Sequence, residues 1–158
     1  MTTGKVIGIY IAPHQGDPTV WMEKVHVIPG SGIEGDRYFQ KLGVKRASSR
    51  SGRELTLVEN EAIDSMRQEG IQISPDQTRR NIITCCISLN ELVGRDFYIG
   101  KIHLHGVRLC EPCDYLAGRT DPKIKQSMVH RGGLRANILS EGFIHIDDPI
   151  STSPKEQA

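Results

Sequence analysis

The alternation of apolar and polar residues along the chain predicts a series of short β-strands. Runs that are rich in β-branched residues, or that alternate strictly, occupy residues 5–12, 23–28, 54–58, 81–87, 97–99, 101–109, 135–139 and 143–146. Pro29-Gly30 ends the second run, and Ser140-Glu141-Gly142 predicts a hairpin turn between the last two.

Helix signals are few by comparison. A helix is expected from Asn60, its N-cap, to Gly70, its stop signal. Residues 88–93 predict a short helical turn, and Asp121-Pro122 predicts the start of a helix over residues 123–129. The regular strand–helix alternation of Rossmann and thioredoxin-like sheets is missing. Many short strands with few helices therefore predict a mainly β fold, either a closed or partly closed barrel or a sandwich.

A single domain is expected over residues 1–150. At 158 residues, with 37% apolar and 25% charged residues, the chain has the size and composition of one soluble globular domain. Residues 41–52 are basic and rich in Ser and Gly, which is typical of a functional lid or of a merely mobile loop. The polar tail at residues 151–158 is expected to be disordered.

The balance of charge excludes some classes of partner. A net charge of +1 argues against bulk binding to nucleic acid or to a membrane surface, so positive charge must act locally. The first residues lack a basic segment followed by a long apolar run, and no stretch reaches a membrane-spanning length. We expect a cytoplasmic location, where the four cysteines stay reduced unless they are catalytic or redox-active.

The pair Cys110 and Cys113 is the strongest pointer to chemistry. Two cysteines at this spacing fit a disulfide, half of a zinc site, a redox pair or one functional thiolate. His103 and His105 share a strand face and could complete a zinc site. The polar loop favours a reachable Cys113, whereas Cys110 ends a strand and is expected to be more enclosed.

Cys85 and Cys86 have a different sequence context. They lie inside the apolar run Ile-Ile-Thr-Cys-Cys-Ile, which favours two buried, inert packing residues that point to opposite strand faces. Trp21 is likewise expected to be a packing residue.

Positively charged residues gather at two places. Arg79-Arg80-Asn81 precedes an apolar strand and is either a solvated start of that strand or an anion-capturing group. Residues 130–135 hold Arg131 and Arg135 around two glycines that permit close backbone approach. A third group, Asp36 and Arg37, ends a glycine-flanked turn in which Asp36 is expected to bond the local backbone.

Taken in order, these motifs resemble the MOSC domain family. The set is Gly-Lys-Val near the start, then Gly-Ile-Glu-Gly-Asp-Arg, Glu-Leu-Thr-Leu-Val, Arg-Arg-Asn-Ile, Cys-Glu-Pro-Cys and Arg-Gly-Gly-Leu-Arg-Ala. This module occurs at the C-terminus of molybdenum cofactor sulfurases and in amidoxime-reducing enzymes, and the resemblance runs to Ile150. The sequence departs from the family in having Asp147-Asp148 where Gly-Asp is common, and no N-terminal β-barrel partner domain is recognised.

The resemblance implies a mainly β barrel that works with the molybdenum cofactor, molybdopterin. It implies Cys113 as the key thiolate and molybdenum ligand, with Cys110 as a neighbouring or resolving thiol. The cofactor-binding residues that it implies are Arg79, Asn81, Arg131, Arg135, Asp36 and Arg37. Pyridoxal phosphate binding is a further function associated with this resemblance.

Two main functions follow as hypotheses. The first is an oxidoreductase that acts on N-hydroxylated or similar small compounds through Cys-ligated molybdenum, with a redox partner protein as a possible electron source. The alternative is a sulfur carrier or cofactor-delivery protein, in which the same cysteine holds a persulfide received from a sulfur donor. A third possibility is a zinc-stabilised domain.

Overall fold

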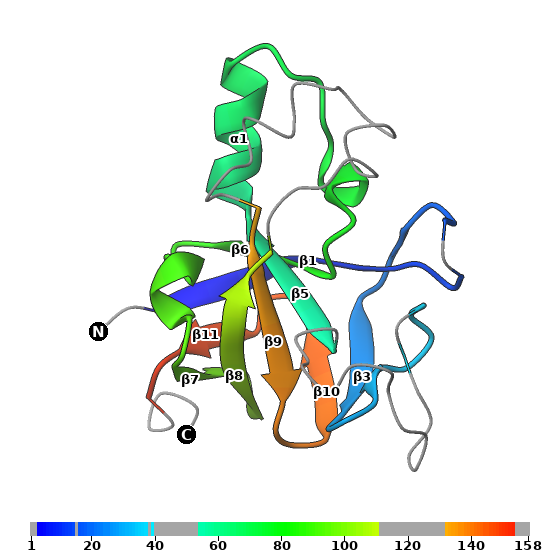
Figure 1. Ribbon diagram of the computed structural model, residues 1–158, viewed down its shortest axis with the longest axis vertical. Coiled ribbons are helices and arrows are strands. Elements are labelled where there is room, and N and C mark those ends of the chain that lie inside the picture. Colours follow the sequence, from blue (N-terminus) through cyan, green and yellow to red (C-terminus); the bar gives the residue numbers. More distant parts are fainter. Residues whose placement is uncertain (1–2, 15, 38, 40–53, 111–131, 154–158) are drawn as a thin grey trace.

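Seven strands close into a β-barrel in the computed structural model, which describes residues 3–14, 16–37, 39, 54–110 and 132–153 (Figure 1). The order around the barrel is β11-β7-β8-β9-β5-β6-β1, and β1 pairs with β11 to close it. The strands span β1 (Thr3–Ile11), β5 (Leu55–Glu59), β6 (Ile82–Cys85), β7 (Asp96–Ile99), β8 (Ile102–Leu109), β9 (Leu134–Ile138) and β11 (Pro149–Ser151). The prediction of a mainly β barrel is confirmed.

A smaller sheet lies beside the barrel. Its order is β10-β3-β4, with β10 (Gly142–His145), β3 (Lys24–Ile28) and β4 (Gly32–Ile33), and Figure 1 shows β10 and β3 next to each other. A short strand, β2 (Val20–Trp21), extends the edge of β1. The predicted hairpin over residues 135–146 is wrong, because β9 pairs with β5 and β8 while β10 pairs with β3 in the other sheet.

The barrel core comes from the inward-facing residues of these strands. β8 alternates between buried and partly exposed residues up to Val107, as a strand with one face in the core must. Its buried residues meet those of the other strands in one apolar cluster, which includes Leu57, Ile82, Phe97, Leu104 and Leu134. The alternation of apolar and polar residues in the sequence of β8 therefore matches the alternation of buried and partly exposed side chains.

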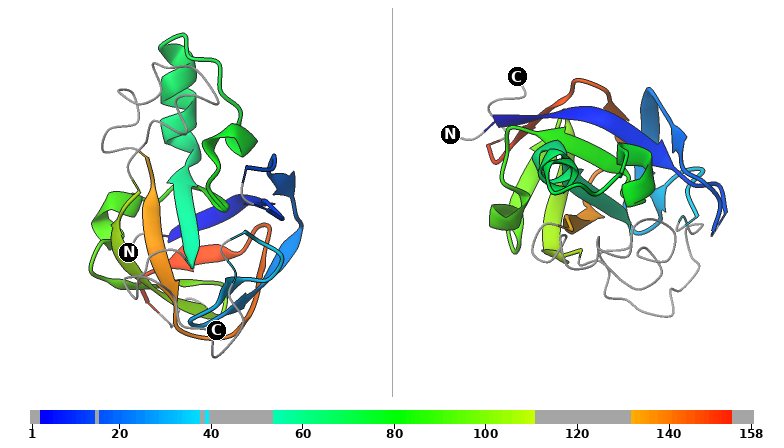
Figure 2. Two further views of the ribbon diagram at one scale, coloured as in Figure 1. Left: turned by 45° about the vertical axis from the view of Figure 1, so that its right-hand side comes forward. Right: turned by 90° about the horizontal axis from the view of Figure 1, so that it is seen from above.

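The helix α1 (Asn60–Gln68) stands over one end of the barrel (Figures 1 and 2). It buries Ile63 and Met66 against Val58, Ile71 and Ile83 in a second apolar cluster. The N-cap is Glu59, one residue earlier than predicted. The 3₁₀ helix η1 (Pro75–Thr78) follows, and the chain then enters β6, which runs parallel to β5.

Several expectations need correction. β11 was not predicted, and Ser151 pairs with Thr3 and is 1% exposed, so the ordered part of the chain extends into the segment expected to be a tail. Trp21 is 49% exposed and is therefore not a packing residue. By contrast, the prediction of a short helical turn at residues 88–93 is confirmed by the 3₁₀ helix η2 (Leu89–Leu92).

Other expectations fall outside the described residues. They are the lid or loop at residues 41–52, the helix at residues 123–129 and the end of the tail from residue 154. Among the helices that the structure describes, none has both the length and the apolar character needed to cross a membrane.

Candidate functional site

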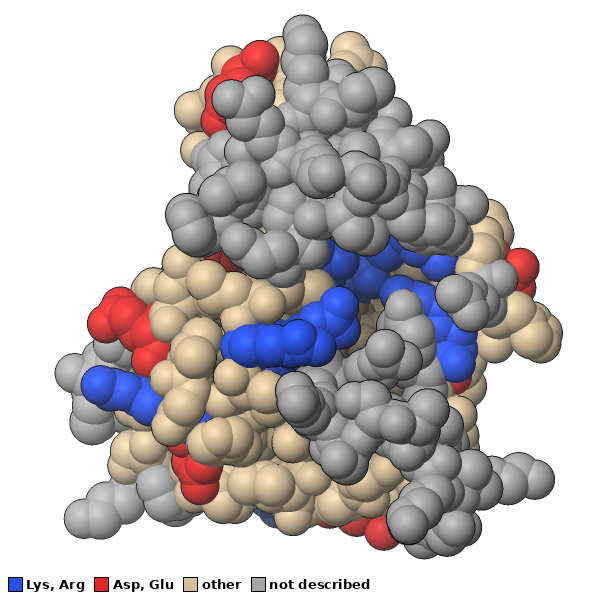
Figure 3. Space-filling model, in the orientation of Figure 1, with Lys and Arg blue, Asp and Glu red and all other residues tan. Residues whose placement is uncertain are grey.

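The Arg79-Arg80-Asn81 segment is buried at the start of β6. Arg79 is 8% exposed, Arg80 9% and Asn81 3%, so a solvated start of the strand is excluded. Buried arginines require hydrogen-bond acceptors around the whole guanidinium group. Figure 3 shows Lys and Arg side chains gathered at the middle of one face, below the level of α1.

Arg80 joins two distant parts of the chain. Its Nε donates to the carbonyl of Gly132 at 2.8 Å, and its Nη2 donates to the carbonyl of Cys110 at 3.2 Å. Cys110 and Gly132 are the described residues that flank residues 111–131, the segment that carries Cys113. Arg80 therefore holds together the two described residues that flank the segment with the predicted functional thiol. Arg80 belongs to the anion-capturing group that the sequence predicts as one alternative, but not to the predicted cofactor-binding residues.

Arg79 and Arg37 form a second set of contacts beside Arg80. Arg79 has a left-handed backbone (φ 61°), and its Nη1 donates to the carbonyl of Asp17 at 2.9 Å. Arg37 donates to the Arg79 carbonyl at 3.1 Å and to Asp36 Oδ1 at 3.1 Å. Arg79 and Arg80 are consecutive at the start of β6, and Arg37 is tied to the backbone of Arg79. Positive charge at this place favours the binding of anions.

Asp36 bonds the backbone of its own turn, as predicted, through its N–H, which donates to the Ile33 carbonyl at 3.0 Å. Its carboxylate also reaches a distant part of the chain, which was not predicted. Its Oδ1 accepts the backbone N–H of Ala12 at 3.0 Å, 24 residues away. The contact is non-local because the turn after β4 lies against the end of β1. The turn that carries Arg37 is therefore held to the barrel by a buried carboxylate.

Asn81 joins three strands. Its Oδ1 accepts the N–H and the hydroxyl of Thr56 in β5, each at 3.1 Å, and its Nδ2 donates to the Tyr10 carbonyl in β1 at 3.1 Å. These bonds hold β1 and β5 at the start of β6. The role of Asn81 as a cofactor contact stays a prediction, and Thr56 is a supporting residue that carries no distinguishing sequence signal.

Gly133 packs closely against the backbone of β5. A Cβ atom at this position would lie 1.9 Å from the carbonyl oxygen of Leu57, and the residue has φ +110°. Its own carbonyl accepts the N–H of Cys110 at 2.7 Å. Cys110 is 1% exposed, so this thiol is enclosed, as expected.

Arg135 lies two residues beyond Gly133, on β9. Its register partner on β8 is Arg108. Like charges directly opposite each other on neighbouring strands are unfavourable, and a nearby anion relieves that repulsion. Arg131 and Cys113 lie outside the described residues.

A cavity of about 250 Å³ adjoins Gly133 on the side of α1. Its lining also includes Glu59 and Glu61. Glu59 accepts the Leu89 N–H at 2.9 Å. Burial raises the pKa of Glu59 above its ordinary value, the Leu89 hydrogen bond opposes this, and the charge of Glu61 adds to the rise.

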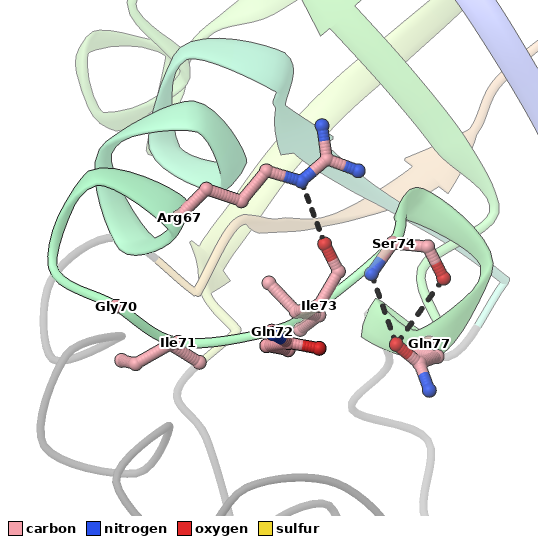
Figure 4. Close-up of a pocket in the computed structure, with 7 residues that line it drawn as sticks. All are labelled: Arg67, Gly70, Ile71, Gln72, Ile73, Ser74 and Gln77. Carbon is pink, nitrogen blue, oxygen red and sulfur yellow. Dashed lines mark hydrogen bonds between the residues drawn. The ribbon is translucent and has the colours of Figure 1, made fainter.

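A separate hollow of about 690 Å³ lies beyond the C-terminal end of α1 (Figure 4). There Arg67 Nε donates to the Ile73 carbonyl at 2.8 Å, and Gln77 accepts the Ser74 N–H at 2.9 Å. These side chains serve local structure, and none of the predicted site residues lines this hollow.

The two histidines that could have completed a zinc site with Cys110 and Cys113 do not support the zinc hypothesis. His103 and His105 each contact Asp96, at 2.8 Å, instead of turning toward Cys110. Along a strand, His105 and Cys110 are separated by roughly 16 Å at about 3.3 Å per residue. Within the described part of the chain, no group of three or more His, Cys, Asp or Glu residues could hold a metal ion.

The contacts of Asp96 with His103 and His105 predict that the stability of the fold depends on pH. Hydrogen bonds from His105 and His103 lower the pKa of Asp96 below its ordinary 3.8. A carboxyl whose pKa is lowered by folding adds stability above its unfolded pKa, and this stability is lost as the pH falls through the folded value. Replacing both histidines by alanine is expected to move the Asp96 carboxyl midpoint, followed by NMR, up toward 3.8. An unchanged midpoint would contradict this assignment.

The hydrogen bonds of Arg80 can be tested by mutation. In Arg80→Ala the Cys110 and Gly132 carbonyls lose a charged donor, so we expect a loss of about 3 kcal/mol in the free energy of unfolding. Arg80→Lys should recover only part of this, because lysine lacks the guanidinium fork. The exposed Arg108→Ala is the control and should change stability by less than about 0.5 kcal/mol. Equal unfolding midpoints for Arg80→Ala and Arg108→Ala would show that the Arg80 contacts contribute nothing.

Comparison with known proteins now decides the family. The sequence model of the MOSC domain matches residues 30–151, which include all of the site residues described above except those on β1 and in the loop that follows it. This chain belongs to the MOSC domain family. No curated protein matches the chain.

Several solved structures share the fold of this chain. YuaD from Bacillus subtilis has a TM-score of 0.76 at 21% identity, with 94% of each chain covered. YiiM from Geobacillus stearothermophilus has a TM-score of 0.71 at 12% identity, covering 95% of this chain and 75% of that one. YiiM from Escherichia coli has a TM-score of 0.64 at 18% identity, covering 94% of this chain and 69% of its own.

Proposed function

We propose that this MOSC domain binds the molybdenum cofactor and reduces small N-hydroxylated compounds, with Cys113 as the protein ligand of molybdenum. One observation carries the proposal. Arg80 holds Cys110 and Gly132 together beside Arg79 and Arg37, so both ends of the Cys113 segment start from a buried, arginine-rich part of the barrel.

The described residues fit a phosphate-bearing cofactor in their chemistry. Guanidinium groups match phosphate oxygens in charge and in geometry. The opposed Arg108 and Arg135 add positive charge on the neighbouring strands. When bound, the cofactor would supply two-electron chemistry with exchange of an oxygen atom.

The residues of the chain must then bind the substrate, orient it and supply the protons for its reduction. Reduction of an N-hydroxylated compound to the amine consumes two electrons and two protons and releases water. A redox partner protein would supply the electrons. Glu59 is suited to hold a proton, since burial raises its pKa and the cavity that it lines extends to Gly133. Pyridoxal phosphate binding also stays a prediction.

The sulfur-carrier function is the second candidate. A persulfide carrier needs a thiolate, and nearby arginines stabilise a thiolate relative to a thiol. Arg80, which bonds the carbonyls of Cys110 and Gly132, is the described arginine that supports this function. The burial of Cys110 makes this residue a poor resolving thiol without local opening.

One experiment separates the two candidates. Protein from a host that makes the molybdenum cofactor is mixed with an N-hydroxylated amidine and a reduced viologen dye, and amidine formation is measured. In parallel, protein without cofactor is incubated with a cysteine desulfurase and analysed by mass spectrometry. We expect amidine formation only with cofactor-loaded protein. A persulfide on Cys113 together with no amidine formation would overturn the oxidoreductase and favour the carrier.

A further inference from the structure

Cys85 and Cys86 contradict the prediction of two buried packing residues. Cys86 is exposed and Cys85 is partly exposed. Their Sγ atoms lie 3.0 Å apart, so they do not point to opposite faces. The expectation failed because β6 ends at Cys85, and the strand alternation stops there.

The local backbone explains why the two thiols meet. Cys86 has φ +72°, a left-handed conformation that non-glycine residues adopt only when their surroundings hold them there. Its N–H donates to Glu61 Oε2, in the first turn of α1, at 2.7 Å. Cys85 remains in register with Lys5 of β1. Both residues are thus held by their backbones while the sulfur atoms stay at the surface.

We propose that Cys85 and Cys86 form a redox-active vicinal dithiol that peroxides oxidise to a disulfide between adjacent residues. The geometry is close to the product, because the sulfur atoms must approach by only about 1 Å to reach the disulfide bond length of about 2.05 Å. This inference does not depend on the proposed cofactor chemistry.

The reaction balances with hydrogen peroxide as the oxidant. The Cys86 sulfur attacks one peroxide oxygen, the O–O bond breaks, and Cys86 becomes a sulfenic acid while the released hydroxide takes the thiol proton to form water. The Cys85 sulfur then attacks the Cys86 sulfur. The S–S bond forms, the S–O bond breaks, and the second hydroxide leaves as water with the Cys85 proton. Two thiols lose two electrons, and the peroxide is reduced to two waters.

The order of attack follows from exposure. Cys86 is the more exposed thiol, and peroxide reaches it first. The hydrogen bond with Cys86 and burial raise the pKa of Cys85 to about 11, so Cys85 is the protonated, less reactive thiol at neutral pH. Cys86 is therefore the attacking residue and Cys85 the resolving residue.

The disulfide should be easy to reduce again. Adjacent Cα atoms across a trans peptide are about 3.8 Å apart, whereas the Cα atoms of ordinary disulfides are about 4.4–6.8 Å apart. The resulting ring is strained, and strained disulfides are the labile ones. A reversible couple is expected rather than a structural bond.

The test uses the Cys110→Ser, Cys113→Ser double variant, which keeps only the two thiols in question. It is treated with one equivalent of hydrogen peroxide, denatured, alkylated and analysed by peptide mass spectrometry. We expect the peptide with Cys85 and Cys86 to lose the mass of two hydrogen atoms, and glutathione to restore both thiols. The further Cys85→Ser change should instead leave at least about tenfold more dimedone-trapped sulfenic acid on Cys86, because the neighbouring resolving thiol is gone.

Three results would overturn the proposal. They are separate oxygen additions on the two sulfurs without loss of hydrogen, covalent dimers between chains, or resistance to peroxide in the folded protein when the denatured chain reacts. If the double variant does not fold, the same peptide is followed in the unchanged chain, where its mass identifies the adjacent pair independently of the other two cysteines.

Discussion

Replacing Gly133 by alanine is expected to lower the free energy of unfolding by about 3–5 kcal/mol, or to prevent folding. The added Cβ atom would lie 1.9 Å from the Leu57 carbonyl oxygen, which belongs to β5 in the wall of the barrel. The left-handed φ of +110° adds its own cost. To relieve this clash, β9 would have to move away from β5. That movement would also disturb the hydrogen bond between Cys110 and Gly133.

Gly70→Ala is the matched control for this prediction. Gly70 has φ +90°, and no atom lies within 4 Å of the place that a Cβ atom would take. Alanine there therefore carries only the backbone cost of about 1–2 kcal/mol. Urea unfolding of both variants isolates the steric contribution at Gly133. Equal losses of stability would mean that the close approach of the two backbones has no energetic consequence.

Cys113→Ser is expected to abolish molybdenum retention while changing the free energy of unfolding by less than about 0.5 kcal/mol. Serine removes the soft thiolate that favours molybdenum and keeps nearly the same size. This expectation comes from the sequence and the family resemblance, since Cys113 lies outside the described residues.

Cys110→Ser is the comparison variant. Cys110 is 1% exposed, so a hydroxyl there is buried. We expect a loss of about 1–2 kcal/mol with only a partial effect on molybdenum content. Metal analysis and chemical unfolding of the two proteins separate ligation from folding. Full molybdenum in Cys113→Ser and none in Cys110→Ser would show that the site had been assigned to the wrong thiol.

Strands with one buried face were the predictable part of the fold. β3 and β8 alternate in exposure as their sequences alternate in polarity, because every second side chain enters the core. α1 was also predictable, since its stop signal at Gly70 reflects a left-handed backbone. Short β11 has too few residues to show any period.

The site was less predictable because its contacts are non-local. Arg80 bonds residues 30 and 52 positions away, and Asp36 bonds one 24 positions away. No local pattern encodes such distances. Likewise, one left-handed residue after β6 brings Cys85 and Cys86 together, although the apolar run around them is typical of burial.

The most direct test of the central claim is the molybdenum and pterin content of the purified protein, made in a host that synthesises the cofactor and reconstituted with cofactor where needed. The account predicts close to one molybdenum and one pterin per chain, and markedly less of both in Arg80→Ala that has been confirmed to be folded. Absence of molybdenum and pterin from both the purified and the reconstituted protein would contradict it.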